Sequence, residues 1–348
     1  MVTHNILIIF ASILLFSCKN DSLKNDDSPW LIPKEDVQEG GPGKDGIPAL
    51  KNPDFTTTAG ATYLGDNDLV LGYKVGNEIR AYPHPILDWH EIINDDVDGK
   101  KIAITYCPLT GSGIGWKRRV GGVTTTFGVS GLLYNSNLIP FDRKSGSNWS
   151  QMKQQCVNGE FLGDKPITYH LVETSWKTWK EMYPQTKVIS EQTGFNRDYT
   201  VYPYGDYRTD NNYTLFTVSR EDLRLPGKER ILGVIIGEKV KAYSIESFNS
   251  NVLVINDAFQ STDLVVIGNK QKNFLVAFES KLQDGTKLTF TAVQDQLPLV
   301  MTDNEGNKWD LFGEALEGGR KGERLIETDS FIAFWFAWAA FHEDIVIY

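Results

Sequence analysis

Residues 70–82 read VLGYKVGNEIRAY, and residues 231–243 read ILGVIIGEKVKAY. Each stretch has an apolar run, a glycine turn and a second run that ends in Ala-Tyr, which is the pattern of a β-hairpin. The spacing between the two copies is far too long for a solenoid repeat. It predicts two related units, each of ordinary domain length.

Other features of the first copy recur in the second copy in the same order. They are an Asn-Asp pair (94–95 and 256–257), an Asp-Gly-Trp series (142–149 and 303–309) and a pair of tryptophans (176–179 and 335–338). We therefore expect an α+β fold that is mainly antiparallel β, made of two internally repeated β-rich halves, each with one or two packed helices. The halves are predicted at residues 54–225 and 226–348.

The predicted elements follow from local patterns of apolar residues and turn residues. Hairpins are expected at 68–82, 114–129 and 138–151, and a strand at 101–106 delivers Cys107 at its end. Helices are expected at 83–93, at 175–183 with Thr174 or Ser175 as its cap, and near the C-terminus with Asp329 or Ser330 as its cap.

The composition limits the function classes. The chain has 348 residues, of which 41% are hydrophobic, so it can bury a sizeable core. Its net charge is −10 and its pI is about 5.1. Nucleic-acid binding needs clustered Lys and Arg to neutralise phosphates, and this acidic balance therefore argues against it.

The N-terminus has the pattern of a targeting segment. Residues 6–16 form an apolar run that is too short to span a bilayer, and Leu-Phe-Ser-Cys18 follows it, which resembles a bacterial lipobox. This predicts a lipoprotein signal peptide at 1–18 and a lipid anchor on Cys18; the alternative is an ordinary cleaved signal peptide. Lys19 after the cysteine resembles the sorting signal for the outer membrane. We expect a flexible tether at 19–53 and a lipid-anchored protein of the cell envelope.

The stretch from 80 to 151 holds polar residues that the second copy lacks. His90 and Glu91 have no counterpart near residues 251–252, and Cys107 falls opposite Gly268. Residues that occur in both copies can be explained by the needs of the shared fold. Residues that occur in only one copy cannot be explained in this way. The candidate site is therefore expected in the first half, although drift in the second copy would produce the same contrast.

Cys107 and His90 are the first candidates for chemistry. A thiolate is a nucleophile and a soft metal ligand, and a nearby histidine lowers the thiol pKa. Cys107 could act as nucleophile with His90 as base and Glu91 or Asn94 orienting the histidine. The structural alternative is a buried cysteine, or a disulfide with Cys156.

The same residues suit a metal site. His84 lies six residues from His90 and could reach the same rim, and one Cys with two His is a donor set for copper or zinc. The signal is weak, because the chain has no C-x-x-C, H-E-x-x-H or H-x-H motif.

A second group of candidates could contact a small ligand or a glycan. They are Tyr134, Asn135, Ser136, Asp142 and Arg143. The alternative for Tyr134 to Ser136 is that they satisfy backbone groups in a turn. For Asp142 and Arg143, an ion pair is preferred over an anion clamp.

Several motifs together resemble one known family. They are AYP (81–83), WHEIIN (89–94), TYCPLTGS (105–112), SGLLYNS (130–136), DR (142–143) and NWSQ (148–151). They resemble a large bacterial and archaeal family catalogued only as a domain of unknown function, from about residue 54 to 348. Many members of that family resemble Cys-Pro-Leu-Cys at the motif that reads TYCPLTGS here (105–112), and Thr110 argues against a two-thiol site.

Three functions remain open from the sequence. The first is a lipoprotein that binds copper, zinc or a small ligand around His90 and Cys107. The second is a cysteine-dependent enzyme, and the third is a non-catalytic scaffold for a glycan or peptide. We rank binding slightly above catalysis, because no complete catalytic constellation is present.

Overall fold

The computed structural model describes residues 28–348. Cys18 and the predicted signal peptide lie outside the described residues. Within residues 28–348, the chain forms short β-strands, two 3-10 turns and three seven-residue helices. The helices are α1 (His84–His90), α2 (Trp176–Met182) and α3 (Trp335–Phe341), and the 3-10 turns are η1 (Lys34–Asp36) and η2 (Ile245–Ser247).

The first half builds three five-stranded sheets and one small hairpin, β9 (Arg119–Val120) with β10 (Val123–Thr124). The first sheet has the order β16 (Val172–Ser175), β4 (Leu69–Val75), β5 (Glu78–Pro83), β17 (Lys187–Ile189), β3 (Phe55–Thr56). The second has the order β15 (Thr168–Tyr169), β8 (Ser112–Lys117), β7 (Lys100–Cys107), β6 (Ile92–Val97), β2 (Leu50–Lys51). The third has the order β1 (Gln38–Glu39), β11 (Phe127–Tyr134), β12 (Asn137–Asp142), β13 (Asn148–Ser150), β14 (Gln155–Asn158).

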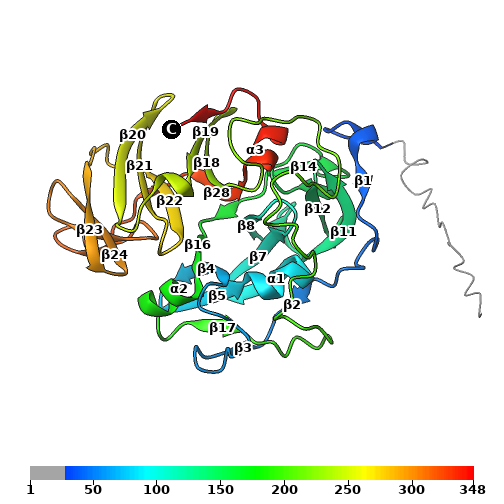
Figure 1. Ribbon diagram of the computed structural model, residues 1–348, viewed down its shortest axis with the longest axis horizontal. Coiled ribbons are helices and arrows are strands. Elements are labelled where there is room, and N and C mark those ends of the chain that lie inside the picture. Colours follow the sequence, from blue (N-terminus) through cyan, green and yellow to red (C-terminus); the bar gives the residue numbers. More distant parts are fainter. Residues whose placement is uncertain (1–27) are drawn as a thin grey trace, which may run out of the picture.

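The second half builds three four-stranded sheets. The first has the order β28 (Asp329–Phe334), β18 (Arg230–Ile236), β19 (Lys239–Ser244), β29 (Val346–Ile347). The second has the order β20 (Leu253–Phe259), β21 (Thr262–Asn269), β22 (Phe274–Glu279), β27 (Ile326–Glu327). The third has the order β23 (Phe290–Gln296), β24 (Leu299–Asp303), β25 (Lys308–Asp310), β26 (Ala315–Glu317). Figure 1 shows this half beside the first, at the left of the view.

Most strand pairs are antiparallel, which agrees with the expected mainly antiparallel fold. Three short strands pair in parallel instead: β17 with β5, β2 with β6 and β29 with β19. The β4–β5 hairpin has the predicted bounds within one residue. Ser175 caps α2 by accepting the Thr178 N–H, as predicted.

Residues that recur in the sequence make similar contacts in the two halves. The Tyr82 hydroxyl donates to Asp95 at 2.7 Å, and the Tyr243 hydroxyl donates to Asp257 at 2.6 Å. Two glycines also correspond: a Cβ on Gly72 would lie 2.1 Å from the Trp179 ring, and a Cβ on Gly233 would lie 2.3 Å from the Trp338 ring. In each case the tryptophan indole packs directly on the strand backbone, because glycine leaves room for it.

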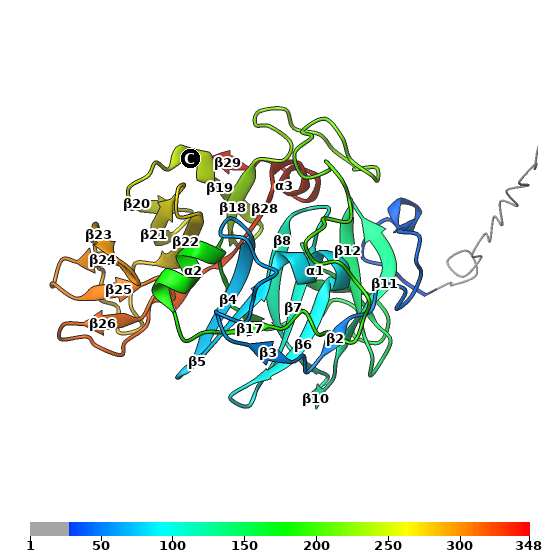
Figure 2. The same ribbon diagram turned by 60° about the horizontal axis from the view of Figure 1, so that its bottom comes forward.

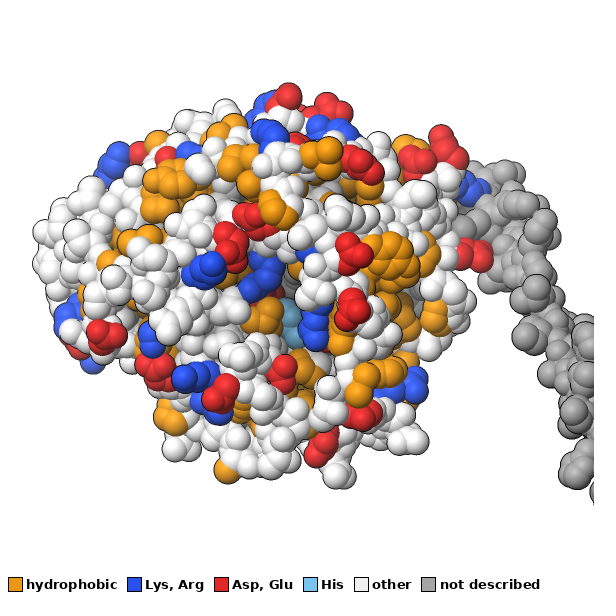
Figure 3. All heavy atoms as spheres, in the orientation of Figure 1, with side chains coloured by type: hydrophobic (Ala, Val, Ile, Leu, Met, Phe, Trp, Pro, Cys, Tyr) orange, Lys and Arg blue, Asp and Glu red, His pale blue; other side chains and the backbone are white. Residues whose placement is uncertain are grey.

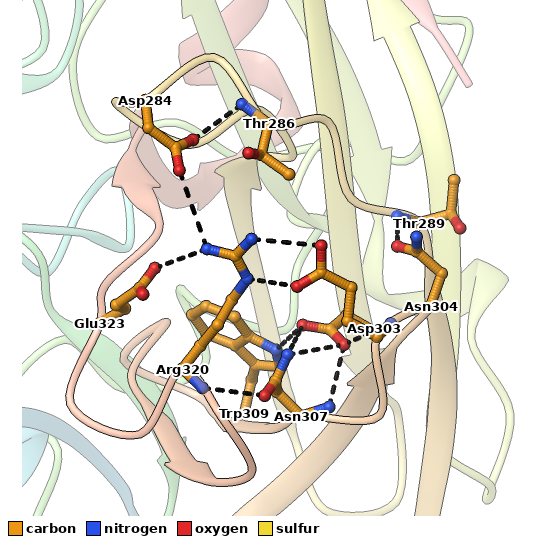
Figure 4. A network of polar contacts seen from close by, with 10 residues as sticks. Asp284, Thr286, Thr289, Asp303, Asn304, Asn307, Trp309, Arg320 and Glu323 are labelled. Atoms are coloured by element: carbon orange, nitrogen blue, oxygen red, sulfur yellow. Dashed lines mark hydrogen bonds and ion pairs between the residues drawn. The ribbon is translucent and has the colours of Figure 1, made fainter.

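The β-turn networks around two tryptophans correspond as well. Trp149 Nε1 donates to Asp142 at 3.1 Å, and Trp309 Nε1 donates to Asp303 at 2.9 Å. Figure 4 shows the second of these, where Asp303 also accepts backbone and side-chain N–H groups of Asn307. Such a carboxylate satisfies the N–H groups of a tight turn that would otherwise be unpaired.

The two halves share their cores. One apolar cluster joins Val70 and Trp179 of the first half to Val265 and Trp309 of the second. A second cluster joins Cys107 and its neighbours to residues of β18 and α3. The segments are therefore packed as one body with continuous apolar contact.

Two predicted helices have different bounds. The helix expected at 83–93 ends at His90, since Glu91 has a φ of 55° and Ile92 pairs with Thr105 as part of β6. The helix expected after Asp329 or Ser330 begins only at Trp335. Residues 329–334 form β28 and pair with β18 along their length, so tertiary pairing overrides the capping signal.

Two further expectations need correction. The predicted pairing of 114–120 with 123–129 is wrong except for the short β9–β10 hairpin. The longer strands have other partners, since β8 pairs with β7 and β11 pairs with β12. The prediction of a flexible tether at 19–53 does not hold for residues 28–53. That part contributes β1 and β2 and buries Ile32 and Leu50, because its few apolar residues find partners in the first half. Within residues 28–348, no helix is long and apolar enough to cross a membrane.

Candidate functional site

Cys107 is the last residue of β7, as predicted, and its side chain is buried with 1% exposure. Pro108 follows and has no N–H to continue the ladder. The Cys107 thiol contacts the Ser136 carbonyl at 3.6 Å. Cys156 is also buried, and both cysteines are free thiols, so the disulfide that the sequence left open is not formed.

A buried network of polar side chains lies beside Cys107. Asn137 Nδ2 donates to Thr110 Oγ1 at 2.9 Å and to Gln151 Oε1 at 2.7 Å, and Ser112 donates to the same Gln151 oxygen at 2.6 Å. Gln151 Nε2 in turn donates to Thr105 at 3.0 Å. These residues come from the motifs at 105–112 and 148–151 and from Asn137, which directly follows the motif at 130–136. A closed hydrogen-bond network therefore explains much of that motif pattern.

His90 does not face Cys107. Its Nδ1 lies 2.7 Å from the Pro48 carbonyl, and its Nε2 lies 2.7 Å from the Tyr199 hydroxyl. A carbonyl oxygen only accepts, so Nδ1 carries the proton and Nε2 accepts from Tyr199. Burial lowers the pKa of His90, which keeps the ring neutral. The histidine therefore orients Tyr199 instead of acting on the thiol.

The predicted metal donors are likewise held apart. His84 Nε2 lies 3.3 Å from Glu173, which also pairs with Arg230. Within residues 28–348, no group of three or more His, Cys, Asp or Glu side chains is placed to hold a metal ion.

Glu91 and Lys228 are buried ionisable groups near Cys107. Burial raises the pKa of Glu91 to about 8. Burial, with a smaller effect of Glu91, raises the pKa of Cys107 to about 11, so the thiol is protonated at neutral pH. Lys228 is 7% exposed, and its Nζ lies 3.3 Å from the centre of the Tyr207 ring. Its burial lowers the lysine pKa to about 7.

The other predicted ligand-binding residues support the scaffold. Asn135 donates to the Ala340 carbonyl at 3.1 Å, and Ser136 donates to the Phe216 carbonyl at 2.8 Å. The Tyr134 ring packs edge-on against Phe341 with centroids 5.5 Å apart. These contacts tie the β11–β12 turn to α3 and to the long connection between β17 and β18.

The Asp142 and Arg143 side chains have separate partners. Asp142 accepts the N–H groups of Lys144 and Ser145 and so closes its own turn. Arg143 makes a bidentate ion pair with Asp45, at 2.6 Å for both nitrogens, on the surface. Asp142 and Arg143 therefore do not form the buried ion pair that was preferred from the sequence. The partner of Arg143 comes instead from the segment that was expected to be a tether.

A pocket of about 230 Å³ lies between α1 and residues 199–208. Asp88 of α1 lines it with 3% exposure, and its Oδ1 has no hydrogen-bond partner among residues 28–348. The Tyr202 hydroxyl, also in the lining, is likewise buried without a partner. Burial raises the pKa of Asp88 to about 8, Arg208 opposes this effect, and Asp68 adds to it.

The wall of this pocket comes from the connection at 190–229, which Figure 2 shows passing α1 and then α3. The connection is fastened at both places, by Trp89 Nε1 donating to Val201 at 3.1 Å and by Arg220 donating to Ala339 at 2.9 Å. We did not single out Asp88, Tyr202 or Arg208 from the sequence. The available signal was a long tyrosine-rich segment without strand or helix periodicity, because such loops are often functional.

A larger cavity of about 410 Å³ lies where β8 faces β28, between the two halves. Some of its polar lining is hydrogen-bonded within the protein: Gln154 donates to Asp329 at 2.6 Å, and Thr328 donates to the Ala277 carbonyl at 2.8 Å. On the face seen in Figure 3, acidic and basic side chains alternate around a central recess in which a histidine is visible.

Comparison with known proteins gives a family. A family model described as a protein of unknown function matches residues 44–345. This confirms the resemblance found in the motifs. No curated protein and no solved structure matches the chain.

Proposed function

The chain belongs to the DUF3179 family, a family of unknown function, and we propose that it is a binding protein for a small organic ligand. The pocket between α1 and residues 199–208 is the proposed site. The observation that carries the proposal is the Asp88 carboxyl, which is buried with one oxygen unpaired and faces this pocket. The Tyr202 hydroxyl beside it is unpaired as well.

Unpaired buried polar atoms need an explanation, because each costs about 1–3 kcal/mol relative to a hydrogen-bonded group. A ligand that hydrogen-bonds Asp88 and Tyr202 would remove that cost on binding. The walls are held in place without the ligand, since His90 fixes Tyr199 and the Ile189 carbonyl accepts from Tyr63 at 2.7 Å. Such a preformed concave site is typical of small-molecule binding.

An organic ligand is favoured over copper or zinc. His84 and His90 are each committed to other partners, and neither contacts Cys107. The thiol would also have to lose its proton to bind a metal, and its raised pKa opposes this. The same two observations disfavour a Cys107–His90 catalytic pair.

The proposal is tested on the full-length chain purified in mild detergent. Native mass spectrometry of the fresh protein should reveal a bound small molecule that denaturation releases. Asp88→Asn should lose or weaken this binding, and the matched control Asp96→Asn should retain it, because Asp96 forms an ion pair with Lys101 outside the pocket. Protein that is empty after purification, and is not stabilised by any compound of a metabolite library, would contradict the proposal.

We also infer that the two halves are repeats of one β-rich unit, at 54–225 and 226–348. Two observations support this. The long strands follow the same order in the three sheets of each half. The Tyr-Asp, Trp-Asp and Gly-Trp contacts of one half also have counterparts in the other. In an experimental structure, the two sets of sheets should superpose strand for strand. Sheets that cannot be superposed together would refute a common unit.

For localisation, we propose a lipid anchor at Cys18 and attachment to the outer membrane. The support is the Leu-Phe-Ser-Cys pattern followed by Lys19. Cys18→Ala should move the protein from the membrane fraction to the soluble fraction and abolish labelling by a radioactive fatty acid. Membrane association that survives this substitution would count against the anchor.

A further inference from the structure

Within the proposed pocket, the geometry points to a zwitterionic ligand: an α-amino acid or a molecule of similar size with one carboxylate and one ammonium group. This inference rests on the proposed function and names its ligand class. It depends on the placement of Asp88 and Arg208, which carry opposite charges when Asp88 is ionised and which line the same pocket without pairing with each other.

Arg208 is an available carboxylate-binding group. Its guanidinium stacks over the Tyr202 ring, with the central carbon 4.0 Å from the ring centre. Among residues 28–348, no carboxylate lies within ion-pair distance of it. Stacking on a ring fixes the plane of the guanidinium but leaves its N–H edges free, and those edges match a carboxylate with two parallel hydrogen bonds.

Asp88 provides the complementary end. It lies on α1, lines the pocket and is almost fully buried, and its Oδ1 has no hydrogen-bond partner among residues 28–348. Asp68 lines the same pocket, and one of its carboxylate oxygens accepts the Gly65 N–H at 2.8 Å. The pocket lining therefore combines two carboxyl groups with one guanidinium group.

This lining disfavours ligands that carry a single charge. A monocation would be repelled by Arg208. A monoanion bound to Arg208 would leave the Asp88 carboxyl without a hydrogen-bond partner. A ligand with an ammonium group towards Asp88 and a carboxylate towards Arg208 satisfies both ends. Its remaining side chain would lie against the rings of Tyr63 and Tyr199, which also line the pocket.

The size of the pocket agrees with this class. A volume of about 230 Å³ is below the range of roughly 300–1,000 Å³ that is usual for drug-sized ligands. It suits a metabolite of amino-acid size. His90 acts here as a positioning residue, because it holds the Tyr199 hydroxyl through its Nε2 at 2.7 Å.

The test uses the full-length chain and four sets of probes: the twenty free amino acids, their methyl esters, their N-acetyl derivatives and neutral hexoses. Thermal shift selects the binders, and isothermal titration calorimetry gives their affinity. At least one free amino acid should bind, whereas its methyl ester and its N-acetyl derivative should bind far more weakly.

The variants assign the two charged ends. Arg208→Gln and Asp88→Asn should each weaken the binding by roughly tenfold or more, which is the effect of losing one charge-assisted hydrogen bond. Arg208 is exposed, so its variant should fold even if Asp88→Asn does not. The matched control is Arg197→Gln, because Arg197 also stacks on an aromatic ring, that of Trp89, but does not line the pocket.

The outcomes separate this inference from the proposed function. Binding of a free amino acid that Arg208→Gln leaves unchanged overturns the assignment. Binding of a hexose or of a singly charged probe, lost in Asp88→Asn while no zwitterion binds, overturns the zwitterion and leaves the pocket as a ligand site. Absence of binding by every probe, together with protein that purifies empty, overturns both.

Discussion

Replacing Asp88 by Asn should change how the stability of the protein depends on pH. The Asp88 carboxyl is buried, and its pKa is raised to about 8 from an ordinary value of 3.8. The folded protein therefore keeps this proton at pH 5 to 7, whereas the unfolded chain has already lost it. Because the folded state binds more protons in this range, the free energy of unfolding falls as the pH rises.

The magnitude follows from the width of that range. Over two pH units, one group that is protonated when folded and ionised when unfolded changes the free energy of unfolding by up to about 3 kcal/mol. Asn has nearly the shape of the neutral acid and does not titrate. The stability of Asp88→Asn relative to wild type should therefore improve by roughly 2–3 kcal/mol between pH 5 and pH 7.

Urea unfolding at pH 5, 6 and 7, followed by tryptophan fluorescence, measures this difference. Other titrating groups, such as His90, affect both proteins equally and cancel. Asp96→Asn is the control: Lys101 lowers the pKa of Asp96, so that carboxylate is ionised in both states throughout this range, and the control difference should be constant. A constant difference for Asp88→Asn as well would refute the buried neutral acid.

Three further predictions concern the surroundings of the site. Thr110→Val removes a hydroxyl that Asn137 donates to, and urea unfolding should show a loss of about 1–3 kcal/mol; an unchanged midpoint would contradict the network. Cys107 should react with a thiol reagent only after unfolding, because its thiol is buried and protonated; rapid reaction of the native protein would contradict this. Gly72→Ala places a methyl group 2.1 Å from the Trp179 ring, so calorimetry should show a destabilisation of about 1–3 kcal/mol or more; wild-type stability would mean that the ring can move.

Local patterns predicted the parts of the fold that local interactions determine. The β4–β5 hairpin and the end of β7 at Cys107 follow from alternating apolar residues, glycine and proline. The Ser175 cap follows from its hydroxyl before a helical segment. The predicted helix at 83–93 was too long. Glu91 has a positive φ, which no pattern in the sequence indicates, and the following residues pair with β7 as β6.

The sequence predicted residues close to the candidate site but not the residues that line the pocket. Cys107 and Glu91 do interact, but His90 is turned towards Pro48 and Tyr199 by contacts with chain segments 42 and 109 residues away. The pocket itself needs Asp88 of α1 and Arg208 of the long connection to meet. Neither the direction of a side chain nor the path of such a connection can be derived from periodicity.

The shared core gives the second half a role that is not visible in its sequence, where the polar residues of the stretch 80–151 are absent. Cys107 belongs to the same apolar cluster as Ile231 and Trp335, and the Phe334 N–H donates to the Thr110 carbonyl at 2.8 Å. We therefore expect selection on the second half to act through packing, since a substitution in β18 or α3 could disable the proposed ligand site without contacting it. Natural variation in those elements should be constrained as tightly as in the strands that carry Cys107, and a fragment that ends before them would expose one wall of its own core to water.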